Sequence, residues 1–253
     1  MAMATMLTSK PNAAQLYDSR VRDLKTDIEF LKRFCEKSSI LEVGCGTGRI
    51  LRDIALSDSY RCVGVELDSD KLKICRERLN KTNIELINTN FLTLTSSQIG
   101  KFDRVLFSFN VLAEFLGPKI RRHALMVARS LLTEGGKIFI TLPAPNDSVY
   151  LKPLDVITKK FPHNGTDWTA TFTITRDLAL RRSTILVNYT TSDNKYEVAD
   201  HYQNEYISRE ELIQHYQHLD LDLEEEFGDF EHRSQVTSSS EMIHILKVKS
   251  KND

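Results

Sequence analysis

The sequence predicts a doubly wound α/β protein with a mostly parallel, seven-stranded sheet and a small antiparallel sheet inserted after the fifth strand. Three observations lead to this prediction. Short apolar runs alternate with helical patterns up to residue 142, and a glycine-rich turn follows the first run at residues 44–48. Beyond residue 142, longer segments alternate apolar and polar residues, which is typical of antiparallel strands.

The first part of the chain is expected to alternate strands with helices. Five apolar runs are expected as strands, at 39–44, 60–66, 84–87, 102–109 and 137–142. Four helical patterns precede or separate them, at 23–37, 47–56, 68–79 and 119–132. Asp68 is a suitable N-cap for the third helix, and Gly135-Gly136 is expected to close the fourth. Strands that alternate with helices require crossover connections and therefore form a parallel sheet.

The second part of the chain is expected to build the inserted sheet and then to complete the first one. Three antiparallel strands are predicted, at 166–174, 182–189 and 196–206, with a turn at 193–195. A helix at 208–216 follows, and Glu211 completes a capping-box pattern with Ser208. Two closing strands, at 219–227 and 241–248, are expected to return to the main sheet.

Composition excludes several classes of protein. The formal net charge is -1 and no basic stretch is present, so no nucleic-acid partner is expected. No apolar stretch is long enough to span a bilayer, and residues 1–12 do not resemble a secretory signal, so we expect no membrane partner and a cytoplasmic location. The four cysteines form no C-x-x-C pair, so no metal is expected. Cys45 is interpreted as a small residue that fills the glycine turn.

The strongest local signal is the turn after the first apolar run, with the sequence Leu-Glu-Val-Gly-Cys-Gly-Thr-Gly at 41–48. Glycines at this spacing allow a tight turn and a close approach of the backbone to a ligand. The helix that follows presents free N–H groups at its first turn. The next strand ends at Glu66, whose carboxylate can accept hydrogen bonds from both hydroxyls of a ribose. These features predict a site for an adenosine-containing ligand at the carboxyl edge of the sheet.

The spacing of the glycines separates the possible adenosine ligands. In the dinucleotide fingerprint G-x-G-x-x-G, the third glycine stands one residue beyond Gly48, where this chain has Arg49. The phosphate-binding pattern G-x-x-x-x-G-K-[ST] is absent as well. A pyrophosphate is therefore not expected. Glu42, which precedes the first glycine, is suited to the amino group of an amino-acid tail, either directly or through water.

These segments together resemble the sequence motifs of class I S-adenosylmethionine-dependent methyltransferases. The matching segments are 41–48, 63–68, 84–92, 102–103 and 132–136. The resemblance implies a Rossmann-like methyltransferase fold and S-adenosylmethionine as cofactor. It implies that Glu66 binds the ribose and that Asn90, in place of the commoner Asp, accepts from the adenine amino group. The implied cofactor-binding residues are Tyr17, Arg22, Glu42, Gly44, Cys45, Gly46, Gly48, Glu66, Leu67, Asn90, Phe91 and Ser108.

The flanks of the chain resemble the small-molecule methyltransferases, and the glycine N-methyltransferase branch is the most similar. Residues 15–22 resemble the lid segment of that branch, and parts of 186–247 resemble its inserted sheet and final hairpin. The resemblance implies that Tyr17 and Tyr206 lie near the sulfonium and the nucleophile, and that Asn110 faces the substrate. Arg20 or Arg22 would hold the cofactor carboxylate, and we favour Arg22. Core packing for the two tyrosines, and a helix-capping role for Asn110, remain open alternatives.

The resemblance also divides the chain and limits the substrate. Together with the composition and the strand pattern, it predicts a flexible tail at 1–14, a cofactor-binding core with its lid at 15–142, a substrate-covering sheet at 143–207 and a closing helix and strand pair at 208–253. Residues 142–146 offer no arginine where the glycine-specific branch uses one to bind a carboxylate, and 237–240 lack an expected aromatic. We therefore expect a pocket for a molecule larger than glycine. His163 and Trp168 are the candidate additional substrate-binding residues.

The sequence favours methyl transfer to an amine nitrogen of a small molecule. An amine needs only to lose a proton before it attacks, whereas a hydroxyl needs a stronger base, and no His–acid pair is evident in the sequence. Transfer to a hydroxyl or to a protein, peptide-terminal or RNA acceptor on the same fold remains an alternative. An NAD-dependent oxidoreductase and a non-catalytic S-adenosylmethionine-binding module are alternatives of other classes. A homo-oligomer is compatible with the sequence.

Overall fold

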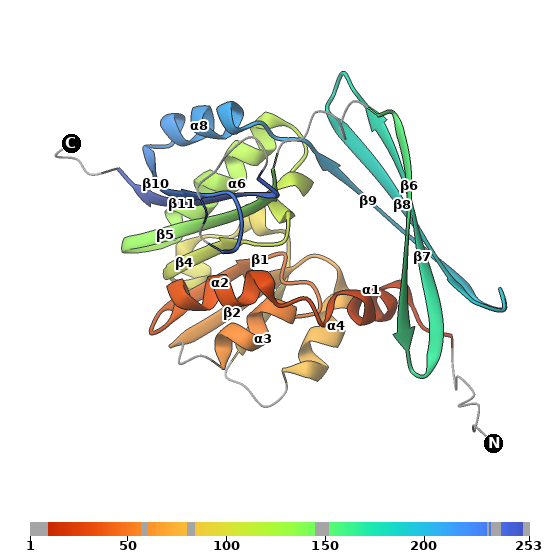
Figure 1. Cartoon of the computed structure of the whole chain (residues 1–253). Coiled ribbons are helices and arrows are strands. Elements are labelled where there is room, and N and C mark those ends of the chain that lie inside the picture. Colours follow the sequence, from red (N-terminus) through yellow and green to blue (C-terminus); the bar gives the residue numbers. More distant parts are fainter. Residues whose placement is uncertain are drawn as a thin grey trace. The chain divides into compact units, whose positions relative to one another are not determined.

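The computed structural model describes residues 10–56, 60–79, 84–144, 152–231, 233 and 239–249. Residues 1–9 of the expected tail, residues 145–146 and residues 237–238 lie outside this range. The chain forms two compact units. The core unit comprises residues 25–146 and 205–253, and the antiparallel unit comprises residues 1–24 and 147–204 (Figure 1). Within the described residues, no helix has the length and apolar character needed to cross a membrane.

The core unit contains a seven-stranded sheet in the order β10-β11-β5-β4-β1-β2-β3. Its strands are β1 (Ser39–Val43), β2 (Arg61–Glu66), β3 (Ile84–Asn88), β4 (Phe102–Phe107), β5 (Leu132–Pro143), β10 (Leu221–Phe227) and β11 (Glu241–Val248). The first five strands pair in parallel, and β11 pairs antiparallel to both β5 and β10. The predicted doubly wound sheet is confirmed. The strand order reverses between β1 and β4, which is where open α/β sheets bind their ligands.

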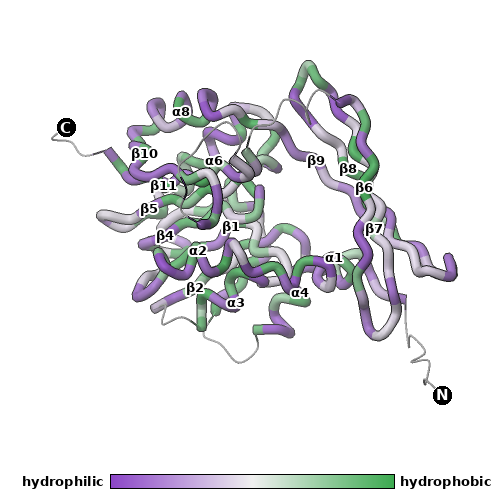
Figure 2. Tube along the Cα trace, in the orientation of Figure 1, coloured by the Kyte–Doolittle hydropathy of each residue, from purple (hydrophilic) through white to green (hydrophobic). Residues whose placement is uncertain are grey.

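The helices of the core unit connect these strands (Figure 1). They are α2 (Thr26–Cys35), α3 (Arg49–Ala55), α4 (Ser69–Arg78), α5 (Ser96–Ile99), α6 (Pro118–Ser130) and α8 (Arg209–His218), with the 3₁₀ turns η1 (Phe91–Thr93) and η2 (Val111–Glu114). Asp68 caps α4 as predicted, because its side chain accepts from the N–H groups of Asp70 and Lys71. Figure 2 shows both polar and apolar residues along the turns of α8, as a helix with one buried face requires.

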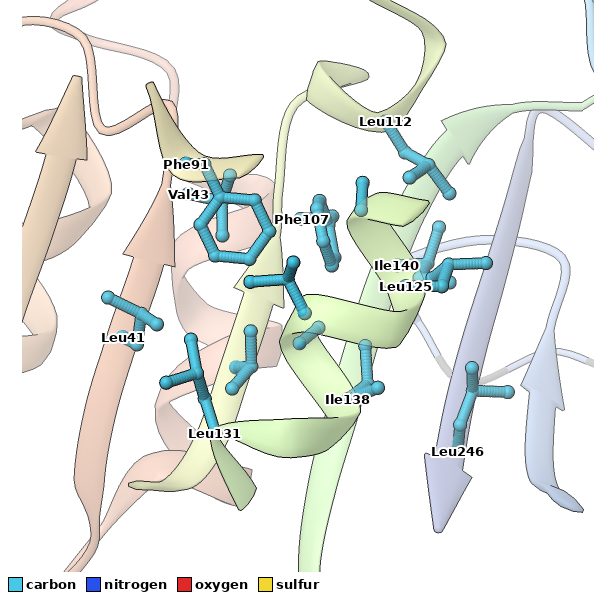
Figure 3. Packing of buried hydrophobic residues seen from close by; sticks show 14 of the residues in the cluster. Leu41, Val43, Phe91, Phe107, Leu112, Leu125, Leu131, Ile138, Ile140 and Leu246 are labelled. Atoms are coloured by element: carbon cyan, nitrogen blue, oxygen red, sulfur yellow. The ribbon is translucent and has the colours of Figure 1, made fainter. Parts of the chain in front are cut away.

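Two apolar clusters cover the two faces of the core sheet. Leu41 and Val43 of β1 belong to one cluster and Ile40 of the same strand belongs to the other, so β1 is buried on both faces. Figure 3 shows the first cluster, in which Leu125 of α6 lies beside Ile140 of β5. Burial on both faces explains why the strands appear in the sequence as continuous apolar runs.

Three predicted details of the core unit are wrong. Helix α6 ends at Ser130, and Gly135-Gly136 lies within β5 instead of closing the helix. Strand β4 ends at Phe107, because Phe109 and Asn110 adopt left-handed backbone angles that cannot continue a strand. Ser208 caps α8 as predicted. The capping box is not formed, because the carboxylate of Glu211 accepts from Arg121 and not from the backbone N–H of Ser208.

The antiparallel unit consists of one helix and a four-stranded sheet in the order β6-β7-β8-β9. Its elements are α1 (Ala13–Val21), β6 (Leu154–His163), β7 (Thr166–Asp177), β8 (Arg182–Thr191) and β9 (Glu197–Glu205). Alternate residues of the strands, with Leu16 of α1, form an apolar cluster around Trp168. The inserted antiparallel sheet is confirmed. Strand β6 and helix α1 are additions that the sequence pattern did not predict.

Candidate active site

The glycine turn at the end of β1 has the backbone geometry that its glycines permit. Gly44, Gly46 and Gly48 have φ angles of 65°, 56° and 79°, which lie in the left-handed region. A Cβ atom at Gly44 would lie 2.3 Å from Cγ2 of Val111. The turn is held to the neighbouring strand, because the N–H of Cys45 donates to the carbonyl of Val65 over 3.0 Å. Any other residue at Gly44 would therefore be strained and would also clash.

Glu66, the last residue of β2, is fixed beside this turn. Its Oε2 accepts from the N–H of Gly46 and its Oε1 from the N–H of Asp68, each over 2.8 Å. A carboxylate oxygen can accept more than one hydrogen bond, so both oxygens retain accepting capacity. Leu67, the next residue, is 70% exposed. This orientation at the carboxyl edge of the sheet suits two adjacent hydroxyls of a ribose.

Glu42 lies under the turn in β1 and is almost fully buried. Its Oε1 accepts from Ser108 Oγ at the end of β4 over 2.7 Å, whereas its buried Oε2 has no hydrogen-bond partner. Burial raises the pKa of Glu42 to about 8, against the lowering effect of the Ser108 hydrogen bond. A buried carboxylate oxygen without a donor is costly. The ammonium group of an amino-acid ligand would supply both the missing donor and the opposite charge, so these residues fit S-adenosylmethionine.

Asn90 and Phe91 lie where the chain leaves β3. The Asn90 side chain accepts from the N–H of Leu92 over 3.0 Å and so caps η1. Phe91 is buried and packs edge-on against Phe107, with ring centroids 5.6 Å apart. The cap fixes the Asn90 oxygen, which retains a lone pair because an amide oxygen can accept two hydrogen bonds. Recognition of adenine by these two residues stays a prediction.

Cys45 packs beneath the glycine turn. It is buried, and its thiol is hydrogen-bonded with Cys75 of α4. This hydrogen bond and burial raise the pKa of the Cys45 thiol far above its ordinary value. A thiol held in its neutral form is a poor nucleophile. In the described part of the chain, no group of three His, Cys, Asp or Glu residues is placed to hold a metal ion.

The segment after β4 contains features that sequence analysis missed. Phe109 and Asn110 have φ angles of 51° and 70°, and Thr141 of β5 accepts from both of their N–H groups. The distances are 2.9 Å to Thr141 Oγ1 and 3.1 Å to its carbonyl oxygen. Asn110 occupies the N-cap position of η2, but its side chain makes no capping hydrogen bond. Left-handed backbone at an aromatic residue is costly, and such residues cluster at functional sites.

A buried ion pair lies beside the segment that contains Phe109. Both terminal nitrogens of Arg49 donate to the carboxylate of Asp27, over 2.7 and 2.5 Å, and both side chains are almost fully buried. The Arg49 guanidinium lies 4.8 Å from the centroid of the Phe109 ring, which is 45% exposed. The sequence could have marked Arg49 as a site residue, because it directly follows the glycine turn. Nothing in the sequence marks Asp27 as its partner.

The remaining predicted site residues are divided between the units. Tyr17, Arg22, His163 and Trp168 belong to the antiparallel unit, and Tyr206 belongs to the core unit. His163 Nδ1 lies 2.7 Å from Ser19 Oγ, which also accepts from Arg22. Burial first, and the charge of Arg22 second, lower the pKa of His163.

The two tyrosines are half-buried, and Trp168 is fully buried within the apolar cluster of its unit. The guanidinium of Arg20 lies over the Tyr17 ring, 5.4 Å from its centroid. Both arginines thus have partners within their own unit, and the Arg22 side chain, which also pairs with Asp18 over 3.9 Å, is 44% exposed. The roles of these residues stay predictions.

The core of the site matches a known family. Residues 40–136 match the family model described as a methyltransferase domain. This range contains the glycine turn, Glu66, Asn90 and Asn110. The part of the chain that contains the glycine turn is thus similar to a methyltransferase domain.

Curated relatives match about a quarter of the chain. The modification methylase CviBIII of Paramecium bursaria Chlorella virus NC1A is 36% identical over 69 residues, which is 27% of this chain and 18% of that protein. The rRNA N(6)-adenosine-methyltransferase METTL5 of Danio rerio is 32% identical over 72 residues, which is 27% of this chain and 35% of that protein. The match thus spans between 18% and 35% of these two relatives' lengths.

Solved structures resemble the whole fold. The CcbJ methyltransferase of Streptomyces caelestis has a TM-score of 0.80 at 20% identity, over 94% of this chain and 97% of that one. The sugar N-methyltransferase KedS8 of a Streptoalloteichus species has a TM-score of 0.72 at 15% identity, over 99% of both chains. CalS10 of Micromonospora echinaspora, an amino pentose methyltransferase solved with S-adenosylmethionine bound, has a TM-score of 0.69 at 18% identity. The match covers 91% of this chain and 94% of that one. At these identities the likeness establishes the fold.

Proposed function

We propose that this protein transfers the methyl group of S-adenosylmethionine to an amine nitrogen of a small molecule. The observation that carries the cofactor half of the proposal is the buried Oε2 of Glu42, which has no hydrogen-bond partner beside a glycine turn that also presents Glu66. An adenosyl amino acid satisfies both acids at once, with its ribose on Glu66 and its ammonium on Glu42. NAD has no ammonium group to place there.

The other cofactor contacts follow from the same placement. Asn90 accepts from the adenine amino group, and the adenine ring lies against the backbone of Phe91. Arg22, whose side chain is 44% exposed, binds the cofactor carboxylate, and Arg20 is the alternative. Leu67, Cys45 and Ser108 complete the walls, the last by holding Glu42 through its hydroxyl.

The chemistry is one in-line displacement. The nitrogen lone pair forms a bond to the methyl carbon as the carbon–sulfur bond breaks, and the electron pair of that bond stays on sulfur. The proton of the acceptor nitrogen passes to solvent, so no strong base is needed. The protein supplies alignment of reacting atoms about 3–3.5 Å apart and excludes water. Tyr17 and Tyr206 place oxygens around the polarised methyl group, and Asn110 orients the acceptor.

Two considerations favour an amine on a molecule larger than glycine. Two of the similar structures carry names that state an amino or N-methyl chemistry, a sugar N-methyltransferase and an amino pentose methyltransferase. The chain has no arginine at 142–146 to bind a small carboxylate, although its lid segment resembles the glycine N-methyltransferase branch. Amino sugars therefore take precedence over amino acids as acceptors, with His163 and Trp168 as additional substrate-binding residues. Hydroxyl and peptide-terminal acceptors are the alternatives.

Two measurements test this proposal. Calorimetric titration should show binding of S-adenosylhomocysteine and no binding of NAD. A tritiated-methyl assay should then compare amino sugars, amino acids and peptides with free N-termini, each beside a matched compound in which hydroxyl replaces the amine. Transfer to an amine and not to its hydroxyl counterpart is expected. Preferential labelling of the hydroxyl compounds would reject N-methylation, and binding of NAD would reject the class.

A further inference from the structure

Arg121 is a buried cation at the first turns of α6, with its side chain only 2% exposed. It donates to three separate segments of the core unit. Its Nη1 donates to the carbonyl of Phe115 over 3.1 Å, and its Nη2 donates to Glu205 Oε2 over 3.2 Å. Its Nε and Nη2 donate to Glu211 Oε1 over 3.2 and 2.8 Å. The planar guanidinium can satisfy this many acceptors in fixed directions, which an ammonium group cannot.

The segments that Arg121 joins carry the proposed acceptor-binding residues. Phe115 ends the 3₁₀ turn that begins directly after Asn110. Glu205 is the residue at which the chain re-enters the core unit, and it directly precedes Tyr206. The Glu205 carboxylate also accepts from the N–H of Gly117 over 2.7 Å. The Arg121–Glu205 pair thus ties the connection after Asn110 to the backbone position of Tyr206.

Stability alone does not account for this arrangement. Burying a guanidinium and a carboxylate costs free energy that their attraction does not always repay, and apolar residues of similar volume often stabilise a fold as well. What the charged pair adds is direction, because each hydrogen bond defines where one segment lies. The first turn of α8 contributes Glu211, and proximity to His215 and Arg121 lowers the pKa of Glu211 to about 2, so this partner stays ionised.

We propose that Arg121 and Glu205 are positioning residues that set the placement of Tyr206 relative to Asn110 for methyl transfer. This inference rests on the proposed function, because it assigns work to the two residues through which the acceptor is aligned. Arg121 touches neither cofactor nor acceptor and acts through Tyr206. Loss of the Arg121 hydrogen bonds therefore lowers the turnover number. It leaves cofactor binding intact, because Glu42 and Glu66 lie on β1 and β2 and not on the segments that Arg121 joins.

The test compares Arg121→Lys with Arg129→Lys, a matched control. Arg129 lies on the same helix, and its 3.6 Å ion pair with Asp220 involves neither Tyr206 nor Asn110. All eight tyrosines are replaced by 3-fluorotyrosine, and the Tyr206 fluorine resonance is assigned by its loss in Tyr206→Phe. We expect this resonance to shift or broaden in Arg121→Lys and to stay unchanged in Arg129→Lys. An unchanged resonance in Arg121→Lys would overturn the inference whatever the fate of the activity.

Kinetics separate this inference from the proposed function. Affinity for S-adenosylhomocysteine should stay within about twofold in Arg121→Lys, while kcat for the fastest amine of the acceptor panel should fall by about tenfold or more. In a double-mutant cycle, Arg121→Lys should add little to the loss caused by Tyr206→Phe, because both changes remove the same contribution. If Tyr206→Phe lowers kcat and the two losses multiply, Arg121 does not act through Tyr206. If S-adenosylhomocysteine fails to bind the unaltered protein, the proposed function itself is wrong.

Discussion

Gly46 donates its backbone N–H to Glu66 Oε2 over 2.8 Å, so the glycine turn after β1 and the acid that ends β2 form one unit. The turn fixes the direction of the carboxylate, and the carboxylate satisfies an N–H that the left-handed conformation of Gly46 leaves outside the sheet. The site is therefore built before a ligand arrives, which reduces the entropy lost on binding.

Replacement of Gly44 by alanine should abolish cofactor binding. The change forces a Cβ into the left-handed region and places it 2.3 Å from Cγ2 of Val111. Gly135→Ala is the matched control, because Gly135 also has a positive φ but an added Cβ would meet nothing within 4 Å. Backbone strain alone costs about 1–2 kcal/mol. Urea denaturation should show a larger loss of stability for Gly44→Ala, and titration with S-adenosylhomocysteine should show loss of binding in that variant only. Equal effects of both changes would mean that the turn tolerates a side chain.

Cofactor affinity should rise with pH up to about 8. Burial holds Glu42 protonated in the free protein below a pKa of about 8, whereas an ammonium ligand favours the carboxylate. Binding must then release a proton, and the dissociation constant for S-adenosylhomocysteine should fall by at most about tenfold per pH unit between pH 6 and 8. Glu42→Gln should bind weakly and without this slope. A wild-type affinity that is flat with pH would contradict the assignment of Glu42.

The same acid should make the free protein less stable as pH rises. The folded-state pKa of Glu42 is raised from 4.5 to about 8, so the folded state holds a proton that the unfolded chain has lost. As pH rises from 4.5 to about 8, the free energy of unfolding therefore falls, by at most about 1.4 kcal/mol per pH unit. Denaturation of the wild type and Glu42→Gln from pH 5 to 8 measures this difference. The gap in stability should change steadily in favour of the variant, and a constant gap would show that Glu42 ionises normally.

Removal of Asp27 should be far more damaging than removal of an exposed acid. Asp27→Ala leaves the buried guanidinium of Arg49 without the carboxylate it binds, and breaking a buried pair in this way costs about 3–5 kcal/mol. Glu85→Ala is the control, because its 2.7 Å ion pair with Arg61 is 39–50% exposed and worth at most about 1 kcal/mol. Chemical denaturation measures both losses. Similar small losses would mean that Arg49 finds another acceptor.

His163 should titrate below an ordinary histidine. Burial and the charge of Arg22 lower its pKa, and Nδ1 of the ring lies 2.7 Å from Ser19 Oγ, which accepts from Arg22. Nitrogen-15 NMR should place the titration midpoint below about 6.5. Arg22→Ala should raise the midpoint, whereas Arg22→Lys, which keeps the charge, should not. An upward shift in both variants would assign the effect to packing and not to charge.

The sequence was sufficient to predict the features that depend on residues close together in the chain. The parallel strands of the core unit are buried on both faces, so they stand out as apolar runs, and the glycines at 44–48 reveal the turn through their spacing. Strand β6 escaped prediction because it is a largely exposed edge strand in which only Phe161 and His163 are buried. Its pairing with β7, and not its own pattern, makes it a strand.

Features that depend on distant pairs were not visible. Arg121 and Glu205 are 84 residues apart, and Arg49 and Asp27 are 22 apart on different helices, so neither partner marks the other in the sequence. The left-handed angle of Phe109 is equally hidden, because it is imposed by hydrogen bonding to Thr141 of β5. Gly135-Gly136 lies inside β5 and not at a helix end, and a glycine pair has the same sequence pattern in both places.

The most direct test of the central claim is calorimetric titration of S-adenosylhomocysteine into the wild type, Glu66→Ala and Glu85→Ala. Glu66 is fixed by two backbone N–H groups where the ribose is placed, whereas Glu85 lies on the neighbouring strand and pairs with Arg61. We predict binding to the wild type and Glu85→Ala with equal affinity, and a loss of at least about tenfold in Glu66→Ala, equivalent to about 1.4 kcal/mol. Undiminished affinity in Glu66→Ala would contradict the placement of the cofactor and the account built on it.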